Sequence, residues 1–151
     1  MFWPNNLTFL YDTGLVTLAE QRNPKTNMYY KQQFGKLSEK LAVKFLKKQG
    51  YKILSLNYRC PLGEVDIVGL EKDTVVFIEV RSRSNSSCGM PMETINFDKK
   101  KHIIRTALYY QKRYNLYDYN VRFDIVSVLK DETTQKLSIE LIKDAFDERG
   151  Y

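Results

Sequence analysis

Four charged side chains lie in two otherwise apolar, β-branched segments of the sequence, and the carboxylates among them could bind a metal ion. Glu64 and Asp66 belong to the first segment, and Glu79 and Arg81 belong to the second. Residues two apart on a strand point to the same face, so each pair shares one side of its strand. Strands that are buried on both faces normally exclude such charges. These residues are therefore the first candidates for a functional site.

The polar stretch between the two segments indicates how they pair. Residues 70–73 are typical of a turn. With a two-residue loop at 72–73, Asp66 lies opposite Glu79, and Glu64 lies opposite Arg81. The same register leaves one face entirely apolar, whereas a shift of one residue would mix charged and apolar side chains on both faces. The sequence therefore predicts a hairpin with four charges at its open end.

The facing carboxylates of Asp66 and Glu79 repel each other at roughly 5 Å between β-carbons. A further interaction must offset this repulsion in the folded protein. The two carboxylates could share a proton, be neutralised by a neighbouring cation, or hold a metal ion. In the plainest alternative, Arg81 and nearby lysines merely neutralise a solvated sheet edge. The hairpin alone leaves these alternatives open.

A carboxylate pair on a hard cation, with a cationic side chain beside it, can hydrolyse phosphodiesters. The metal activates water and neutralises charge on the phosphate, and the cationic residue supports the transition state. Magnesium suits such a site, because it usually takes one or two carboxylates and keeps positions for water and phosphate. The metal reading therefore points to Mg²⁺ or Mn²⁺ and to phosphoryl chemistry.

The composition narrows the class of protein. The chain has 151 residues, 43% of them hydrophobic, as expected for one packed domain. Its net charge of +6 and pI of about 9.2 favour a polyanionic partner such as nucleic acid. A single histidine and two cysteines exclude a multi-histidine zinc site and a disulfide framework. We expect a cytoplasmic location and no membrane partner, since no apolar run approaches about 20 residues and no Lys or Arg precedes Arg22.

Periodicity predicts the elements that must position the site: a helix, three strands, a second helix and two strands. Their expected ranges are 34–49 and 98–114 for the helices, and 51–58, 121–129 and 137–142 for three of the strands. The other two strands form the hairpin on either side of the turn at 70–73, the first beginning at residue 64 and the second at residue 74. Residues 82–92 are expected to form a loop beside the site. Residues 1–32 show no clean period and are interpreted as an N-terminal extension, docked or partly ordered, before a domain at 33–151.

Each helix combines an apolar face with residues of possible function. The predicted core faces are Leu37, Leu41, Ala42, Phe45 and Leu46 in the first helix, and Ile103, Ile104, Ala107 and Leu108 in the second. Glu39 lies at the edge of the first stripe, where it could pair with Lys36 or point toward the sheet. The second helix begins with a basic cluster, and tyrosines follow, so phosphates and unpaired bases could both find partners.

Many motifs in order resemble a known family. They are Gly63-Glu64-Val65-Asp66-Ile67-Val68, Phe77-Ile78-Glu79-Val80-Arg81-Ser82-Arg83, Gly35, Glu39, Ala42, Gly50-Tyr51, Asn57-Tyr58-Arg59, Gly89, Pro91, Lys99, Arg122-Phe123-Asp124 and Ala145-Phe146. The pattern resembles the YraN family of uncharacterised bacterial proteins. That family is similar to the restriction-endonuclease-like superfamily, with its D…(D/E)xK motif, and to archaeal-type Holliday junction resolvases.

The resemblance implies a three-layer α/β fold, in which helices flank a mixed central sheet, and it suggests roles for residues. Asp66 and Glu79 would be metal ligands, with the carbonyl of Ile78 or Val80 as a further ligand. Glu39 would be a helix carboxylate directed at the site. The basic motif position falls on Arg81, where the superfamily usually has lysine. Arginine can stabilise a phosphate but stays protonated, so this departure bears on the hydrolytic rate.

The resulting leading hypothesis is a metal-dependent endonuclease that acts on DNA, including branched or structured DNA, with Glu39, Asp66, Glu79 and Arg81 as catalytic residues. The expected nucleic-acid contacts are Arg83, Lys99, Lys100, Lys101 and Arg105. A homodimer is expected, because two cuts on a duplex need two sites. The alternatives are a nucleic-acid-binding module without hydrolytic activity, motivated by Arg81, and a protein-interaction role.

Overall fold

The computed structural model describes residues 9–11, 24–84, 95–147 and 149, and it has the expected α/β architecture. Its elements are β1 (Phe9–Tyr11), α1 (Pro24–Lys48), β2 (Lys52–Cys60), β3 (Gly63–Glu71), β4 (Thr74–Arg83), α2 (Phe97–Tyr114), β5 (Asn120–Lys130) and β6 (Leu137–Phe146). The predicted order is confirmed, with β1 added ahead of it. Most of the expected loop at 82–92 lies outside the described residues. No helix in the described ranges is long and apolar enough to cross a membrane.

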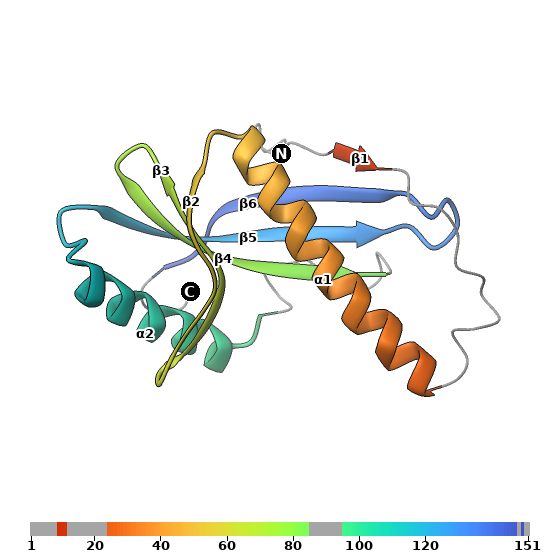
Figure 1. The fold of residues 1–151 in the computed structure, drawn as a ribbon, viewed down its shortest axis with the longest axis horizontal. Coiled ribbons are helices and arrows are strands. Elements are labelled where there is room, and N and C mark those ends of the chain that lie inside the picture. Colours follow the sequence, from red (N-terminus) through yellow and green to blue (C-terminus); the bar gives the residue numbers. More distant parts are fainter. Residues whose placement is uncertain (1–8, 12–23, 85–94, 148, 150–151) are drawn as a thin grey trace.

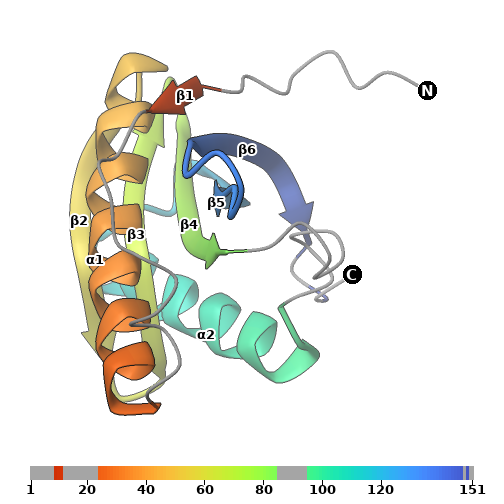
Figure 2. The ribbon, with the colours of Figure 1, turned by 90° about the vertical axis from the view of Figure 1, so that its right-hand side faces the viewer.

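The strands form one mixed sheet in the order β1-β6-β5-β4-β3-β2 (Figures 1 and 2). Only β4 and β5 run parallel, and the chain passes from one to the other through α2. The other neighbours are antiparallel. As a result β4 lies inside the sheet, and its residues from Val75 to Glu79 are all buried.

Two hydrophobic cores, one on each face of the sheet, complete three layers. One core contains Ala42, Phe45 and Leu46 of α1, packed on Ile67, Val76, Ile78, Val126 and Val128 among others. The other contains Ile103, Ala107 and Tyr110 of α2, packed on Val75, Phe77, Phe123 and Ile125 among others. The helices therefore cover opposite faces, which confirms the expected three-layer fold.

The predicted register of the β3–β4 hairpin is confirmed as far as the two strands pair. The loop is the two-residue turn at 72–73, with Lys72 in the left-handed region at φ 55°. Pairing runs from Glu71–Thr74 to Ile67–Ile78 and, within these fully described strands, goes no further. Ile67, in the last pair, packs on the α1 side of the sheet. Val65, two residues further toward the open end of the hairpin, packs on the α2 side. The expected continuous apolar face is therefore broken where the strands separate.

The first helix is longer than the periodicity indicates. It begins at Pro24 rather than at residue 34, so the expected domain boundary at residue 33 falls inside α1. Proline is well suited to a first helical turn. Met28 and Tyr29 are 72% and 59% exposed. Because neither residue belongs to the cores that pack on the sheet, no amphipathic pattern marks this part of the helix.

Two residues of the predicted core faces are exposed instead. Leu37 of α1 is 39% exposed, and Leu108 of α2 is 60% exposed. The expectation was wrong because an apolar arc on a helical wheel is wider than the strip of helix that touches the sheet. Ser38 and Thr106, both buried, take up part of those contact strips.

Candidate active site

The carboxylate pair lies where β3 and β4 separate. Asp66 is partly buried, and its Oδ2 accepts a hydrogen bond from the backbone N–H of Val80 at 2.8 Å. This N–H belongs to the part of β4 beyond the last strand pair, so the carboxylate replaces a ladder partner. Glu79 is only 4% exposed, on the sheet face that α2 covers. The alternative of a solvated sheet edge is therefore wrong for Glu79.

Two cations contact the same oxygen of Glu79. Lys99 Nζ lies 3.3 Å from Oε1, and Arg81 Nη1 lies 3.7 Å from it. The other oxygen, Oε2, is buried and has no hydrogen-bond partner among the residues that the structure describes. A buried acceptor without a partner is costly. The neighbouring cations therefore leave one side of the carboxylate unsatisfied.

The pKa values of the two carboxyl groups also indicate that the nearby cations do not fully offset the cost of burying them. Burial, followed by the charge of Asp66, raises the pKa of Glu79 from 4.5 to about 7, although Lys99 and Arg81 oppose the rise. Burial also raises the pKa of Asp66, against the effects of the Val80 N–H and Lys99. Two cations thus fail to offset the burial of two carboxylates, and a further cation or proton would stabilise the site.

Glu64 lies at the margin of this site. Its carboxylate pairs with Arg59 Nε of β2 at 3.2 Å rather than with Arg81, and both side chains are largely exposed. Glu64 and Arg81 do not pair across the strands as expected, because β3 and β4 have already separated at this level. Glu64 still raises the pKa of Asp66 through its charge.

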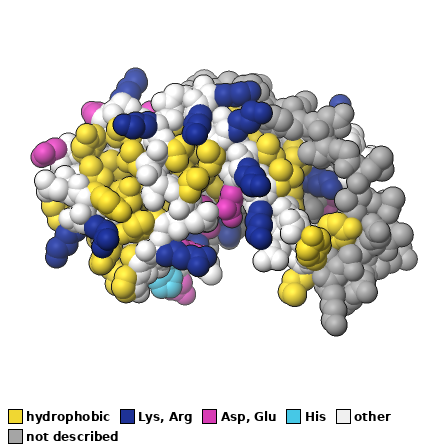
Figure 3. Space-filling model, viewed as in Figure 1, with side chains coloured by type: hydrophobic (Ala, Val, Ile, Leu, Met, Phe, Trp, Pro, Cys, Tyr) yellow, Lys and Arg dark blue, Asp and Glu magenta, His cyan; other side chains and the backbone are white. Residues whose placement is uncertain are grey.

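A surface pocket of about 350 Å³ adjoins the carboxylate pair through Lys99. Its lining residues are Pro61, Leu62, Gly63, Glu64, Lys99 and His102. Gly63 has φ 148°, and an added Cβ there would come within 2.8 Å of Thr106 Oγ1, so α2 packs directly on this turn. In the view of Figure 3, the surface is hollowed at its lower centre, with Lys and Arg side chains on both sides and an acidic side chain among them. The pocket lining itself has one basic and one acidic side chain, Lys99 and Glu64, beside His102.

Glu39 is partly buried on α1, and its partner comes from β2. Its Oε2 accepts a hydrogen bond from Asn57 Nδ2 at 3.4 Å. It forms neither the alternative ion pair with Lys36 nor a hydrogen bond with Asp66 or Glu79, all of which are described residues. The structure thus supplies no direct contact for the expected role of Glu39 in the site.

The other basic residues expected at the site spread along β4 and α2. Arg83 donates to Ser127 Oγ at 3.3 Å, Lys100 lies over the Phe146 ring, and Lys101 lies over the Phe97 ring. Arg105 is exposed on α2. Of the basic cluster that opens this helix, Lys99 is the residue that reaches the carboxylate pair, a contact that depends on how α2 packs and that the sequence does not reveal.

The tyrosines divide between core and surface. Tyr110 is buried, and its ring contacts those of Tyr58 and Tyr114 at centroid distances of 4.8 and 4.5 Å. Tyr114 and Tyr117 are 50% and 63% exposed. Both exposed rings lie at the end of α2 or after it, whereas the basic residues of α2 that are expected to bind nucleic acid lie in the first half of the helix.

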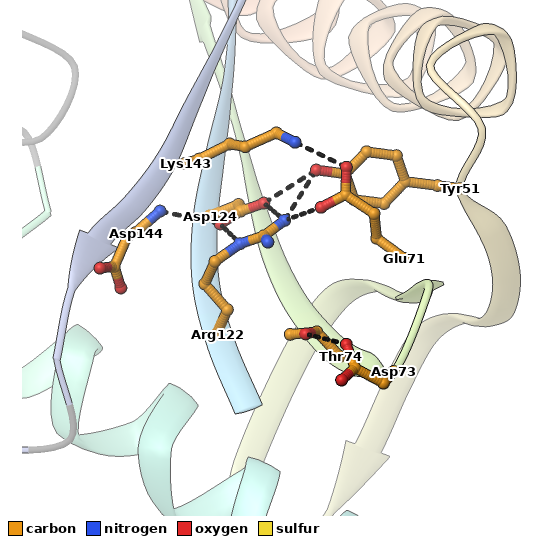
Figure 4. Close-up of polar contacts among 8 residues, drawn as sticks. All are labelled: Tyr51, Glu71, Asp73, Thr74, Arg122, Asp124, Lys143 and Asp144. Carbon is orange, nitrogen blue, oxygen red and sulfur yellow. Dashed lines mark hydrogen bonds and ion pairs between the residues drawn. The ribbon is translucent and has the colours of Figure 1, made fainter. Parts of the chain in front are cut away.

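A second polar cluster lies on the opposite face of the sheet, and sequence reasoning missed it. Arg122 of β5 contacts Asp124 at 2.8 Å, Tyr51 Oη at 2.8 Å and Glu71 at 2.7 Å, and Lys143 contacts Glu71 at 2.6 Å (Figure 4). Asp124 is completely buried. Opposite charges two apart on an apolar strand, as at Arg122 and Asp124, are the sequence signal that indicates such a pair.

This second cluster is a structural support. The carboxylate of Asp124 accepts bonds from Arg122, Tyr51 and the backbone N–H of Asp144, so it is fully satisfied. Burial and the charge of Asp124 raise the pKa of Tyr51. Asp124 pairs in the sheet with Ile78, the residue before Glu79. The network therefore fixes β4 and β5 directly behind the carboxylate pair.

A mixed sheet between two helical layers, with a buried carboxylate pair on adjacent strands, is consistent with proteins of the restriction-endonuclease-like class. The sequence model that describes the Uncharacterised protein family UPF0102 matches residues 38–128 of this chain. UPF0102 proteins of Clostridium acetobutylicum and Syntrophus aciditrophicus are 44% and 46% identical, over 74% and 75% of this chain and 92% and 87% of their own lengths. A UPF0102 protein of Caldicellulosiruptor saccharolyticus is 44% identical over 77% of this chain and 98% of its own. The chain belongs to the UPF0102 family.

Proposed function

We propose that the protein is a metal-dependent nuclease that hydrolyses phosphodiester bonds in DNA. The observation that carries this proposal is Glu79 Oε2, a carboxylate oxygen that is buried, has no partner among the described residues and lies beside a second carboxylate. A divalent cation would satisfy that oxygen and offset the burial of both charges. The family membership is compatible with this function but does not name it.

The donor set suits magnesium or manganese. Asp66 and Glu79 would hold the ion, with the carbonyl of Ile78 or Val80 as a further ligand. The described residues contain no group of three or more His, Cys, Asp or Glu side chains placed to hold a metal. This fits Mg²⁺, which usually binds one or two carboxylates and keeps several waters. When bound, such an ion activates a water molecule and neutralises charge on a phosphate.

The remaining residues of the site would bind and orient the substrate. Arg81 and Lys99 place two positive charges beside the carboxylates, where they can hydrogen-bond the non-bridging oxygens of a phosphate. Arg105 and Lys101 on the exposed side of α2 would contact phosphates further along the strand. Burial of Glu79 keeps bulk water from its carboxylate, which strengthens every charge interaction around it.

A cleavage assay tests the proposal. The purified protein is incubated with Mg²⁺ or Mn²⁺ and labelled linear, flapped and four-way DNAs, with RNA for comparison. We expect metal-dependent cleavage that Asp66→Asn and Glu79→Gln abolish, and that the exposed control Glu132→Gln retains. Cleavage that survives both site substitutions would show that another protein in the preparation is responsible and would refute the assignment.

A second candidate is a DNA-binding module without hydrolytic activity, which Arg81 favours. Arginine replaces the lysine that the motif usually carries, and it stays protonated. This alternative predicts salt-dependent DNA binding without cleavage under any divalent ion. Arg81→Lys separates the two: increased cleavage identifies arginine as the limiting residue, and unchanged binding without cleavage supports the module.

A further inference from the structure

Lys99 occupies a defined place at the start of α2. Its backbone N–H donates to Oδ1 of Asn96, the N-cap of the helix, at 2.9 Å. The cap fixes the first turn and therefore the point from which the lysine side chain extends. That side chain is 29% exposed and ends 3.3 Å from Glu79 Oε1. Lys99 thus reaches a buried carboxylate from a rigid helix end while remaining open to solvent.

Lys99 makes the shorter cation contact with the pair. Its Nζ lies 3.3 Å from Glu79 Oε1, whereas Nη1 of Arg81, which lies on the same strand as Glu79, is 3.7 Å from that oxygen. Lys99 comes from a different element, α2, so its side chain can move without moving β4. Its charge also lowers the pKa of Asp66, as expected for an ammonium close to both carboxylates.

The side chain of Lys99 has a second position available, in the adjoining pocket. The side chain also lines the 350 Å³ pocket, together with Glu64 and His102. A lysine ammonium is a compact charge on a flexible stem, whereas the guanidinium of Arg81 is planar and larger. A rotation of the stem would move Nζ from Glu79 toward this pocket, where a phosphate could accept its hydrogen bonds.

We propose that Lys99 is a resident counter-ion of the Asp66–Glu79 pair, which a divalent cation displaces and which then binds the phosphate of the substrate. In the absence of the divalent cation, Lys99 keeps the two carboxylates together. When the pair is occupied, its ammonium leaves Glu79 Oε1 and meets a non-bridging phosphate oxygen. This inference rests on the metal site of the proposed function.

Metal affinity, measured without nucleic acid, tests the exchange directly. Mn²⁺ binding to the wild-type protein, Lys99→Met and Lys112→Met is followed by titration calorimetry. Lys112 is the matched control, because it removes the same charge from the exposed side of the same helix. If the ammonium competes with the ion, Lys99→Met binds Mn²⁺ about tenfold more tightly, a change of about 1.4 kcal/mol. Lys112→Met stays within about twofold.

A second measurement separates the phosphate contact from a purely structural role. At saturating Mn²⁺, Lys99→Met cleaves DNA at least a hundredfold more slowly, a loss of the size that removal of one charge-stabilising donor causes. Lys99→Arg restores part of the rate. A lysine that merely stabilised the fold would lower the unfolding midpoint without tightening Mn²⁺ binding, and that result overturns the inference.

The outcomes distinguish this inference from the function on which it rests. Mn²⁺ binding that Glu79→Gln abolishes but Lys99→Met leaves unchanged or weakened overturns the counter-ion role and leaves the metal site standing. Mn²⁺ binding that is absent, or that survives Glu79→Gln, overturns the metal site and the inference with it. Circular dichroism of each variant establishes that it is folded, and Lys99→Gln replaces Lys99→Met if the latter fails to fold.

Discussion

Replacing Glu79 with glutamine is expected to stabilise the metal-free protein at alkaline pH. The pKa of Glu79 is raised from 4.5 to about 7, chiefly by burial. A group whose pKa is raised by folding supports stability while it is protonated and loses that support as pH rises through the folded-state value. The free energy of unfolding of the wild type should therefore fall relative to Glu79→Gln between pH 5 and pH 8.

The size of the effect follows from the shift. From 4.5 to about 7 is roughly 2.5 pKa units, and at 1.36 kcal/mol per unit the full loss is about 3 kcal/mol. About 2 to 3 kcal/mol of this falls between pH 5 and pH 8, because the unfolded chain is already partly ionised at pH 5. Glutamine has nearly the same shape and does not ionise, so the difference between the two proteins measures the cost of charging Glu79 beside Asp66.

Urea unfolding in the presence of a chelator measures the difference at each pH. Glu132→Gln, which neutralises an exposed carboxylate, is the control and should follow the wild type within about 0.5 kcal/mol at every pH. Added Mn²⁺ should restore the stability of the wild type at pH 8 and leave Glu79→Gln unchanged. A difference between wild type and Glu79→Gln that is constant from pH 5 to pH 8 would show that folding does not raise the pKa of Glu79.

Three further predictions concern the fold around the site. Arg122→Met leaves Asp124 buried without its cation and should cost about 3 to 5 kcal/mol in urea unfolding; a loss below about 1 kcal/mol would contradict the structural role of the network. Lys72→Gly relieves a left-handed backbone conformation at φ 55° and should raise the free energy of unfolding by about 1 kcal/mol, so a decrease would exclude this turn. Leu108→Ser should change stability by less than about 0.5 kcal/mol, since Leu108 is 60% exposed, whereas a loss above about 2 kcal/mol would place it in a core.

The hairpin register could be predicted because two independent patterns agree on it. A two-residue turn and the alternation of charged and apolar residues both favour the pairing of Ile67 with Ile78 that the structure has. The point at which the strands separate could not be predicted. It depends on how β3 bends over α2, where Val65 packs, and the local alternation of residues contains no information about that contact.

Of the two cations at the site, one could be predicted from the sequence and the other could not. Arg81 lies two residues after Glu79 on one strand, so their contact follows from strand geometry alone. Lys99 is 20 positions further along the chain than Glu79, and its contact requires the packing of α2 on the sheet. For the same reason Arg122 and Asp124 are recognisable as neighbours, whereas the contacts of Arg122 with Tyr51 and Glu71 span 71 and 51 residues and depend on the whole fold.

A crystal structure of the protein soaked in Mn²⁺, with anomalous scattering measured from the ion, tests directly whether the two carboxylates hold a metal. We expect one anomalous peak in contact with Asp66 and with Glu79 Oε2, the buried oxygen without a partner among the described residues. We also expect Lys99 Nζ to have moved away from Glu79 Oε1. If saturating Mn²⁺ leaves no peak between the two carboxylates and Lys99 still contacts Glu79, the pair is not a metal site.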